Sequence, residues 1–336
     1  MADLLAPRPP LEERADPYEH VFIIHPVRDC PFLQLGRRQK VTEGGQEHLG
    51  IPHWFVLDAC LAIAGKGFLS STPFRSGRVT TDVNGYLTGE EYRFFLDDGD
   101  DYAICTDFME WTPPLRKDVP ERWLAIDRHK KGTPNPIEED LFSDISVCII
   151  ADDRICAVSG LNEELRATHL VPQVYASWYH MHQIYGQYTY PGPIKAPKAR
   201  PIDDIRQIIT LESGLLESMD HPSFVIAPFS DEYVAFFFAS RRVGMVKHYH
   251  LRTVRLPQRI EGYALFTRFA WAMISIAQAL PPTALPDKRK GRHESDGLSD
   301  TSLHLPSGQR RRTHATGDAG TESYDDLSND EDFVMG

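Results

Sequence analysis

The most regular pattern of apolar residues in this chain lies between Glu261 and Leu280. Apolar side chains recur there every three or four residues, at Leu265, Phe269, Ala272, Ile276 and Leu280. Pro281 and Pro282 follow, and proline cannot continue a helix. The pattern predicts a helix over residues 261–280 whose apolar face packs into a core.

Short apolar runs separated by turn residues fill the first part of the chain. Regular structure is expected to begin at Val21–Ile24, and Pro52–Ala64 is expected to form an apolar helix or buried segment. Short strands are predicted at Arg78–Val83 and Glu91–Phe95. The acidic segment Asp97–Asp101 has turn composition, and a hairpin from Glu91–Phe95 to Tyr102–Cys105 is therefore predicted.

The second part of the chain repeats this mixed pattern. Strands are predicted at Ile145–Ile150, Arg154–Val158, Phe224–Ala227 and Tyr233–Phe238. Trp178–Tyr185 is compatible with a helix, and Ile208–Met219 is expected to be a turn that leads into a short helix. Tyr188–Pro201 holds prolines at 191, 193, 197 and 201 and is predicted to be an inserted loop.

Changes in composition divide the chain into segments. Residues 1–18 are predicted to be a flexible N-terminus, 19–125 a mixed α+β domain and 126–144 a linker rich in proline and charge. Residues 145–281 are predicted to form a second domain, and 282–336 a disordered tail with few apolar residues. The expected fold class is α+β.

Charge and length limit the classes of function. With 336 residues, 41% of them hydrophobic, the chain is long enough for one large or two moderate cores. A net charge of -12 argues against a generally cationic nucleic-acid binder, although a local basic patch remains compatible. We expect no membrane partner, because no apolar run has the length of a membrane span.

The location of the protein is expected to be intracellular. Met1–Leu5 lack the basic and apolar regions of a secretory signal, and the five cysteines contain no C-x-x-C pair, which is typical of reduced, buried thiols. The tail carries basic clusters at 288–292 and 310–312. These clusters indicate either nuclear import or merely a solvated charged segment, in which case a cytoplasmic location is expected.

The densest group of chemically informative residues extends from Cys156 to Pro228. Its motifs are Cys156-Ala-Val-Ser-Gly160, then Ala167-Thr-His-Leu-Val-Pro172, then Asp203-Asp204 through Phe224-Val-Ile-Ala-Pro228. This succession resembles fungal HNH nuclease domain-containing proteins, in which a small-residue turn, a strand-ending histidine, a polar loop and a short helix surround one metal ion. The resemblance extends over most of residues 20–280, because Leu265–Met273 is similar to the closing helix of that family.

The resemblance implies an HNH-like ββα-metal module with specific roles. His169 takes the position of the general base, a task suited to a group that titrates near neutral pH. Other family-motif positions fall on Cys156, Gly160, Pro172, Gln207 and Leu216. The implied cofactor is one divalent ion, Mg²⁺ or Mn²⁺, with Asp220 and Asp204 as candidate ligands.

The HNH motif is degenerate at two of these positions. Gln207 stands where the family has an asparagine, and Leu216 where it has a metal-binding histidine. Gln207 is expected to brace a tight loop less well than asparagine, and leucine offers no lone pair to a cation. We therefore expect an endonuclease-like protein with weakened or lost hydrolysis of DNA or RNA; the alternative is a non-catalytic scaffold that binds nucleic acid or protein.

Other histidine pairs give weaker signals. His180 and His182 would lie on different faces of a helix, which disfavours joint metal binding. His248 and His250 would share a face if 247–251 were a strand, but no third ligand is nearby in sequence.

The composition of the tail leads to a test. Removal of residues 283–336 should leave the melting temperature nearly unchanged, because this segment has no apolar periodicity with which to dock. Differential scanning calorimetry of the full and shortened chains measures the effect. A drop of several degrees would show that the tail packs against the folded protein.

Overall fold

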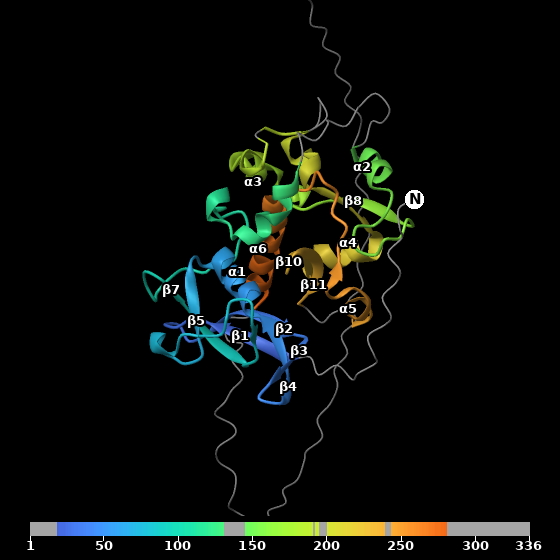
Figure 1. Cartoon of the computed structure of the whole chain (residues 1–336). Coiled ribbons are helices and arrows are strands. Elements are labelled where there is room, and N and C mark those ends of the chain that lie inside the picture. The colour runs from blue at the N-terminus through green and yellow to red at the C-terminus, as the bar shows by residue number, and fades with distance from the viewer. Residues whose placement is uncertain (1–18, 131–144, 191, 195–199, 239–242, 281–336) are drawn as a thin grey trace, which may run out of the picture. The chain divides into compact units, whose positions relative to one another are not determined.

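The computed structural model describes residues 19–130 and 145–280, with three short gaps in the second range. The residues left undescribed are 1–18, 131–144, 191, 195–199, 239–242 and 281–336. The predicted flexible N-terminus, the tail with both basic clusters and most of the predicted linker therefore lie outside the described residues. The described residues belong to one compact unit. Several small sheets and α-helices make up this unit (Figure 1), which confirms the α+β class.

The first part of the chain forms two small sheets. One has the strand order β2-β1-β7-β5, in which β1 pairs parallel with β7 and the other pairs are antiparallel. Its strands are β1 (Glu19–Ile24), β2 (Pro31–Arg37), β5 (Gly67–Ser70) and β7 (Glu91–Leu96). The other sheet has the order β3-β4-β6, with β3 (Gln39–Glu43), β4 (Gln46–Pro52) and β6 (Tyr86–Leu87). Helix α1 (His53–Ile63) follows β4 directly, as predicted for the apolar segment 52–64.

The second part contains two sheets and most of the helices. Strands β8 (Leu165–His169) and β9 (Ile208–Glu212) pair antiparallel, and a separate sheet has the order β10-β11-β12. The strands of the latter are β10 (Phe224–Phe229), β11 (Glu232–Phe237) and β12 (Arg252–Thr253). The α-helices are α2 (Ile145–Asp153), α3 (Ala176–Met181), α4 (Ser213–Asp220), α5 (Val243–Tyr249) and α6 (Gly262–Ala279).

Short 3-10 helices connect these elements. They are η1 (Arg75–Gly77), η2 (Arg116–Asp118), η3 (Glu121–His129), η5 (Gln173–Tyr175), η6 (Ile184–Gln187), η7 (Pro201–Asp203) and η8 (Ile205–Gln207). Residues 126–129, the start of the predicted linker, thus belong to a helical turn.

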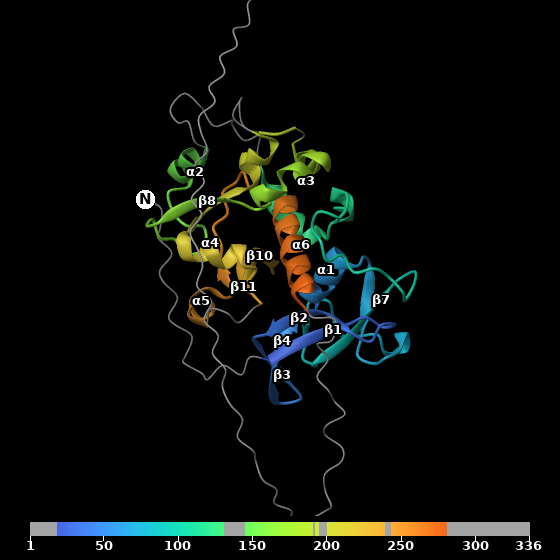
Figure 2. The ribbon, with the colours of Figure 1, turned by 180° about the vertical axis from the view of Figure 1, so that it is seen from behind.

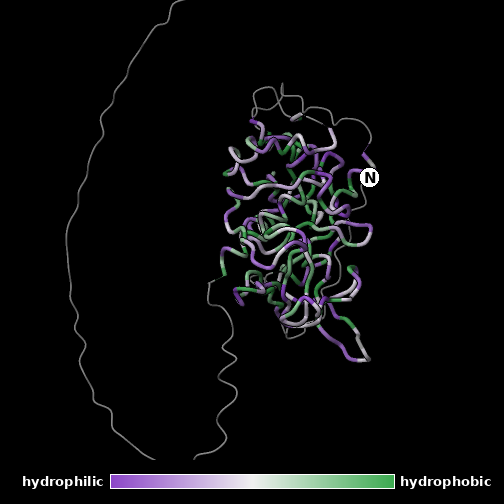
Figure 3. The backbone as a smooth tube through the Cα atoms, turned by 90° about the vertical axis from the view of Figure 1, so that its left-hand side faces the viewer, coloured by the Kyte–Doolittle hydropathy of each residue, from purple (hydrophilic) through white to green (hydrophobic). Residues whose placement is uncertain are grey.

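Helix α6 is the centre of the hydrophobic core. It contacts α1, η3, β10 and β2, so elements from both parts of the chain surround it (Figure 2). The ring of Phe55 stacks on Phe236 at 4.2 Å and meets Phe269 edge-on at 5.2 Å, while Trp123 lies 4.7 Å from Phe269. The hydrophobic stretches of the backbone gather toward this interior (Figure 3). The predicted apolar stripe is therefore a helix buried on nearly every side.

Some predicted strands are wrong. Residues 145–150 belong to helix α2, and 154–158 form a loop and turn with no strand. Arg78–Val83 contributes only an isolated bridge between Ser70 and Arg78. The predicted hairpin is also wrong, because residues 102–105 are not a strand and β7 pairs with β1 and β5.

The reason for these errors is tertiary packing. In α2, Cys148 and Ile149 are buried, and Arg259 binds Asp152 and Asp153 at the end of the helix at 3.1 and 2.6 Å. These contacts favour a helix for a short apolar run whose β-branched residues suit a strand equally well. In the hairpin region, the edges of β7 are already occupied by two partner strands.

His250 lies in a turn after α5, so the strand considered for 247–251 is absent. Its Nδ1 accepts a hydrogen bond from the Phe237 backbone N–H at 3.1 Å, and its Nε2 lies 2.7 Å from the side-chain amide of Gln39. Burial, assisted by the charge of Arg38, lowers the pKa of His250 to about 3. The imidazole thus joins β11 to β3 in its neutral form.

This neutral histidine predicts a dependence of stability on pH. Below the ordinary pKa of 6.5 the unfolded chain binds a proton at His250 that the folded chain does not bind until about pH 3. Stability from this group is therefore complete above pH 6.5 and is lost as the pH falls. Between pH 7 and 5 the native chain should lose up to about 2 kcal/mol more than the His250→Gln variant, as measured by urea unfolding.

The control for this measurement is His248→Gln, which alters an exposed histidine two residues away. It should show the same loss between pH 7 and 5 as the native chain. Equal pH dependence of the native chain and His250→Gln would contradict the assignment.

Candidate functional site

Strands β8 and β9 and helix α4 form a β-β-α unit. His169 ends β8 and pairs with Ile208, the first residue of β9, and α4 begins directly after β9. The residues between the two strands include the predicted inserted loop Tyr188–Pro201, whose described residues contain no strand and only the first residue of η7. The expected turn into a short helix at 208–219 is therefore a strand followed by a helix. The motif residues from Cys156 to Asp220 lie on or beside this unit.

His169 is buried at the end of β8, with 9% of its surface exposed. Its Nε2 lies 3.2 Å from Oδ1 of Asp203, and the Gln173 side-chain nitrogen lies 3.4 Å from both atoms. Burial lowers the pKa of His169, and the nearby Asp203 opposes this effect only in part. The ring is thus largely neutral near pH 7, which is the form that accepts a proton.

Asp203 joins His169 to an exposed arginine. Its Oδ2 accepts hydrogen bonds from the backbone N–H and Nε of Arg200, both at 3.1 Å, and its Oδ1 lies 3.2 Å from Nη2 of Arg200. Burial raises the pKa of Asp203, but hydrogen bonds and charge from Arg200 outweigh this effect and lower it. The carboxylate therefore stays ionised beside His169.

Gln207 braces the loop beyond β8, although its position was expected to do so poorly. Its side-chain oxygen accepts the Val171 N–H at 2.9 Å, its side-chain nitrogen donates to the Ile202 carbonyl, and its backbone carbonyl accepts the Leu170 N–H at 2.7 Å. The residue is fully buried. The longer amide thus holds the end of β8 against η7.

The remaining motif positions have structural contacts. Cys156 and Gly160 close a tight turn in which the Gly160 N–H donates to the Cys156 carbonyl at 2.9 Å, and Gly160 has a φ of +79°, which favours glycine. Pro172 precedes η5 and accepts the Tyr175 N–H at 2.9 Å. Leu216 is half-buried on α4 and packs against the main core.

The two candidate metal ligands are each paired with an arginine. Asp204 is fully buried, and its Oδ2 and Oδ1 accept from Nη2 and Nε of Arg206 at 2.6 and 2.9 Å. Asp220 lies at the end of α4 and pairs with Nη2 of Arg268 at 3.2 Å. Within the described part of the chain, no three His, Cys, Asp or Glu side chains gather closely enough to hold a metal ion.

These arginine partners were not predicted from the sequence. Arg200 and Arg206 lie three and two residues from their aspartates, a local signal that could have been used. Arg268 comes from α6, 48 residues from Asp220, and its guanidinium also donates to the carbonyls of Leu170 and Met219. No local sequence pattern predicts this contact, because the two residues are far apart in the chain.

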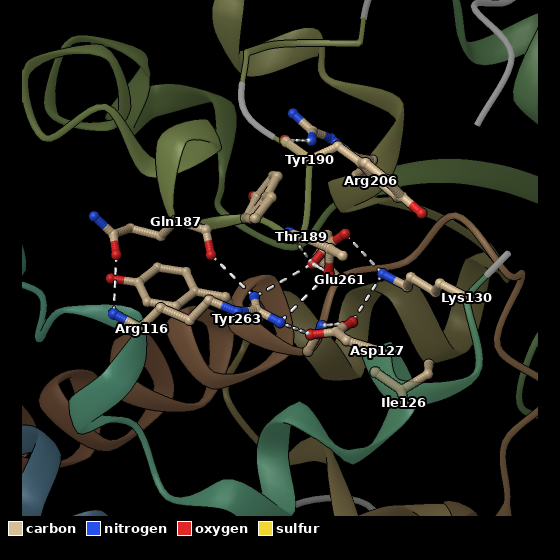
Figure 4. Close-up of polar contacts among 12 residues, drawn as sticks. Arg116, Ile126, Asp127, Lys130, Gln187, Thr189, Tyr190, Arg206, Glu261 and Tyr263 are labelled. Atoms are coloured by element: carbon tan, nitrogen blue, oxygen red, sulfur yellow. Dashed lines mark hydrogen bonds and ion pairs between the residues drawn. The ribbon is translucent and has the colours of Figure 1, made fainter. Parts of the chain in front are cut away.

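A second polar cluster surrounds the start of α6 (Figure 4). Asp127 binds Nη2 of Arg116 at 2.6 Å and Nζ of Lys130 at 2.8 Å. Glu261 binds the same Lys130 nitrogen at 2.8 Å and approaches Nη1 of Arg116 at 3.5 Å. The four side chains form a closed ring of alternating charge, and Thr189 donates to Glu261 through its N–H and its hydroxyl, both at 3.0 Å.

This charge ring, defined by Arg116, Asp127, Lys130 and Glu261, borders a cleft of about 520 Å³ between η3 and the β10–β11 turn. Lys130 belongs to both, but its ammonium group is already paired with two carboxylates. The cluster therefore has the composition of a structural support, in which each buried charge has an opposite partner.

No described helix is both long and apolar enough to cross a membrane. Comparison of the chain with models of known protein families, with curated proteins and with solved structures finds no match.

The contacts of Gln207 lead to a testable expectation. Gln207→Leu should lower the free energy of unfolding by about 2 to 4 kcal/mol, because it leaves the buried Val171 N–H and Ile202 carbonyl without partners. Gln46→Leu, on the exposed β3–β4 hairpin, is the control and should change stability by less than about 0.5 kcal/mol. Urea denaturation measures both; equal losses would contradict the bracing role.

Proposed function

We propose that this chain is an HNH-endonuclease-like protein in which the β8–β9–α4 unit is retained as a scaffold and metal-dependent hydrolysis of phosphodiesters is weakened or lost. Under this proposal its partners are nucleic acid, either DNA or RNA, or another protein. The observation that carries the proposal is the pairing of the aspartates around the unit with arginine: Asp203 with Arg200, Asp204 with Arg206 and Asp220 with Arg268.

The charge of these pairs argues against a strong metal site. A divalent cation binds carboxylates by supplying positive charge and accepting oxygen lone pairs. In Asp204 both oxygens already receive hydrogen bonds from a guanidinium. Removing one partner from such a buried pair costs roughly 3–5 kcal/mol, since the other charge stays buried and unpaired. The free energy of binding a metal ion at Asp204 would have to exceed that cost.

The helix side of the unit supports the same conclusion. The resemblance places a metal-binding histidine at Leu216, but this leucine packs against the core and has no donor atom. Asp220, one turn further along α4, is directed to Arg268. The side chains that would complete a cation site thus contribute to packing and internal ion pairs instead.

One observation favours residual hydrolysis as a second candidate. His169 keeps its position at the end of β8, and burial lowers its pKa, so the ring can accept a proton at neutral pH. If hydrolysis survives, His169 is its general base, with Mg²⁺ or Mn²⁺ as the ion. His169→Ala should then remove most of the plasmid nicking measured with Mn²⁺.

Restoring the family residues tests the proposal. The native chain should nick supercoiled plasmid no faster than buffer with Mn²⁺. The double variant Leu216→His with Gln207→Asn should bind Mn²⁺ at least about tenfold more tightly than the native chain, because it adds an imidazole ligand. Electron paramagnetic resonance of free Mn²⁺ measures binding, and gel electrophoresis measures nicking.

The matched control is Leu216→Asn with Gln207→Asn, which introduces similar polarity without the imidazole and should not bind Mn²⁺ more tightly. Robust nicking by the native chain that depends on His169 would overturn the loss of catalysis. A folded double variant that gains no Mn²⁺ binding would instead contradict the HNH-like assignment of α4.

A further inference from the structure

Hydrogen-bond donors from separate segments converge on the carboxylate of Asp203. Its Oδ1 lies 3.2 Å from Nε2 of His169, 3.4 Å from the Gln173 side-chain nitrogen and 3.2 Å from Nη2 of Arg200. Its Oδ2 accepts from the backbone N–H and Nε of Arg200, each at 3.1 Å. A single anion thus receives donors from the end of β8, from η5 and from the residue before η7.

The burial of this cluster is uneven. His169 and Asp203 are 9% and 7% exposed, whereas the side chain of Arg200 is 60% exposed. The anion therefore rests against a buried imidazole on one side and against a solvent-facing guanidinium on the other. Arg200 is therefore the member of the cluster that solvent reaches.

The other two arginine–aspartate pairs differ in this respect. Arg206 and Arg268 are buried, and each guanidinium also donates to backbone carbonyls, of Tyr190 and Gly192 and of Leu170 and Met219 respectively. Those guanidiniums are fixed by the fold itself. For Arg200, the side-chain hydrogen bonds found within the described residues all go to Asp203.

The donor set has the chemistry of an oxyanion site. A guanidinium fork, an imidazole N–H and an amide N–H are donors that bind phosphate oxygens, and charge-assisted bonds of this kind are the stronger ones. A carboxylate and a phosphate present similar pairs of oxygen acceptors to a guanidinium. The position of Asp203 is therefore one that a phosphate group could also occupy.

We propose that His169, Gln173 and Arg200 form a phosphate-binding site that Asp203 fills as an internal anion. Binding of a phosphate and the Asp203 contact are then mutually exclusive, so the free protein is held in a closed state by its own carboxylate. The phosphate is either a free ion or part of a nucleic-acid backbone. The second possibility rests on the proposed nuclease-like function.

Isothermal titration with inorganic phosphate tests this inference on the full chain. Asp203→Ala should bind phosphate at least about tenfold more tightly than the native protein, because it frees charged donors while leaving them in place. Asp231→Ala makes the same change in net charge on an exposed turn and should bind like the native protein. The double variant Arg200→Ala with Asp203→Ala should lose the gain.

A second variant keeps the test decisive if Asp203→Ala does not fold. Asp203→Asn retains an oxygen acceptor and the shape of the side chain but removes the charge, and it should also bind phosphate more tightly than the native protein. The inference is overturned if neither folded variant exceeds Asp231→Ala, or if the gain persists without Arg200.

A second titration distinguishes the two possible sources of the phosphate. A short single-stranded oligonucleotide and its uncharged methylphosphonate analogue are compared with inorganic phosphate for binding to Asp203→Ala. Preference for the charged oligonucleotide identifies a nucleic-acid backbone, and preference for inorganic phosphate identifies the free ion; either supports the site. Mn²⁺ binding by the Leu216→His variants is independent of these measurements, so failure of the phosphate site and failure of the nuclease-like assignment are distinguishable.

Discussion

The charge ring at the start of α6 is the interaction on which the arrangement of the core depends. Helix α6 is apolar on nearly every side, and apolar contacts alone would fix its position along the axis only loosely. Glu261 fixes the position of α6 along its axis. Its buried carboxylate needs polar partners, and it finds them in Lys130, Arg116 and Thr189. Gly262 permits the close approach, since a Cβ there would lie 2.1 Å from the Trp123 carbonyl oxygen. The ring thus holds η2, η3 and the inserted loop to the central helix.

Arginine performs a similar task in the β-β-α unit. Arg268 extends from the central helix to the carbonyls of Leu170 and Met219, and it thereby joins the end of β8 to the end of α4. Burial lowers the pKa of Arg268 to about 10, so the group remains charged at neutral pH. A cation from the protein itself thus links the end of β8 to the end of α4.

Much of the fold follows from the sequence where the pattern is long or flanked by clear breaks. Helix α6 and strands β7, β10 and β11 were predicted because their periodicity or their turn residues are clear, and a helix was one of the two structures expected for the segment that forms α1. Helix α2 was not predicted, because its six-residue apolar run suits a strand equally well and the contacts that favour the helix are tertiary, among them the one with Arg259, 106 residues from Asp153. The candidate site divides similarly. The family resemblance implied the position of His169 at a strand end, whereas the contacts of Gln207 and the pairing of Asp220 with Arg268 are tertiary and have no local signal.

The central position of α6 has a consequence for the order in which the chain can fold. Phe269 completes the aromatic cluster of Phe55 and Trp123, yet it follows Phe55 by roughly 200 residues in the sequence. During synthesis the first two small sheets and α1 therefore emerge well before α6, which packs against β2 and α1. A chain with such distant contacts exposes apolar surface for longer, and it is then prone to associate with other unfinished chains or with chaperones. Helix α6, the last helix of the described residues, thus completes the core late.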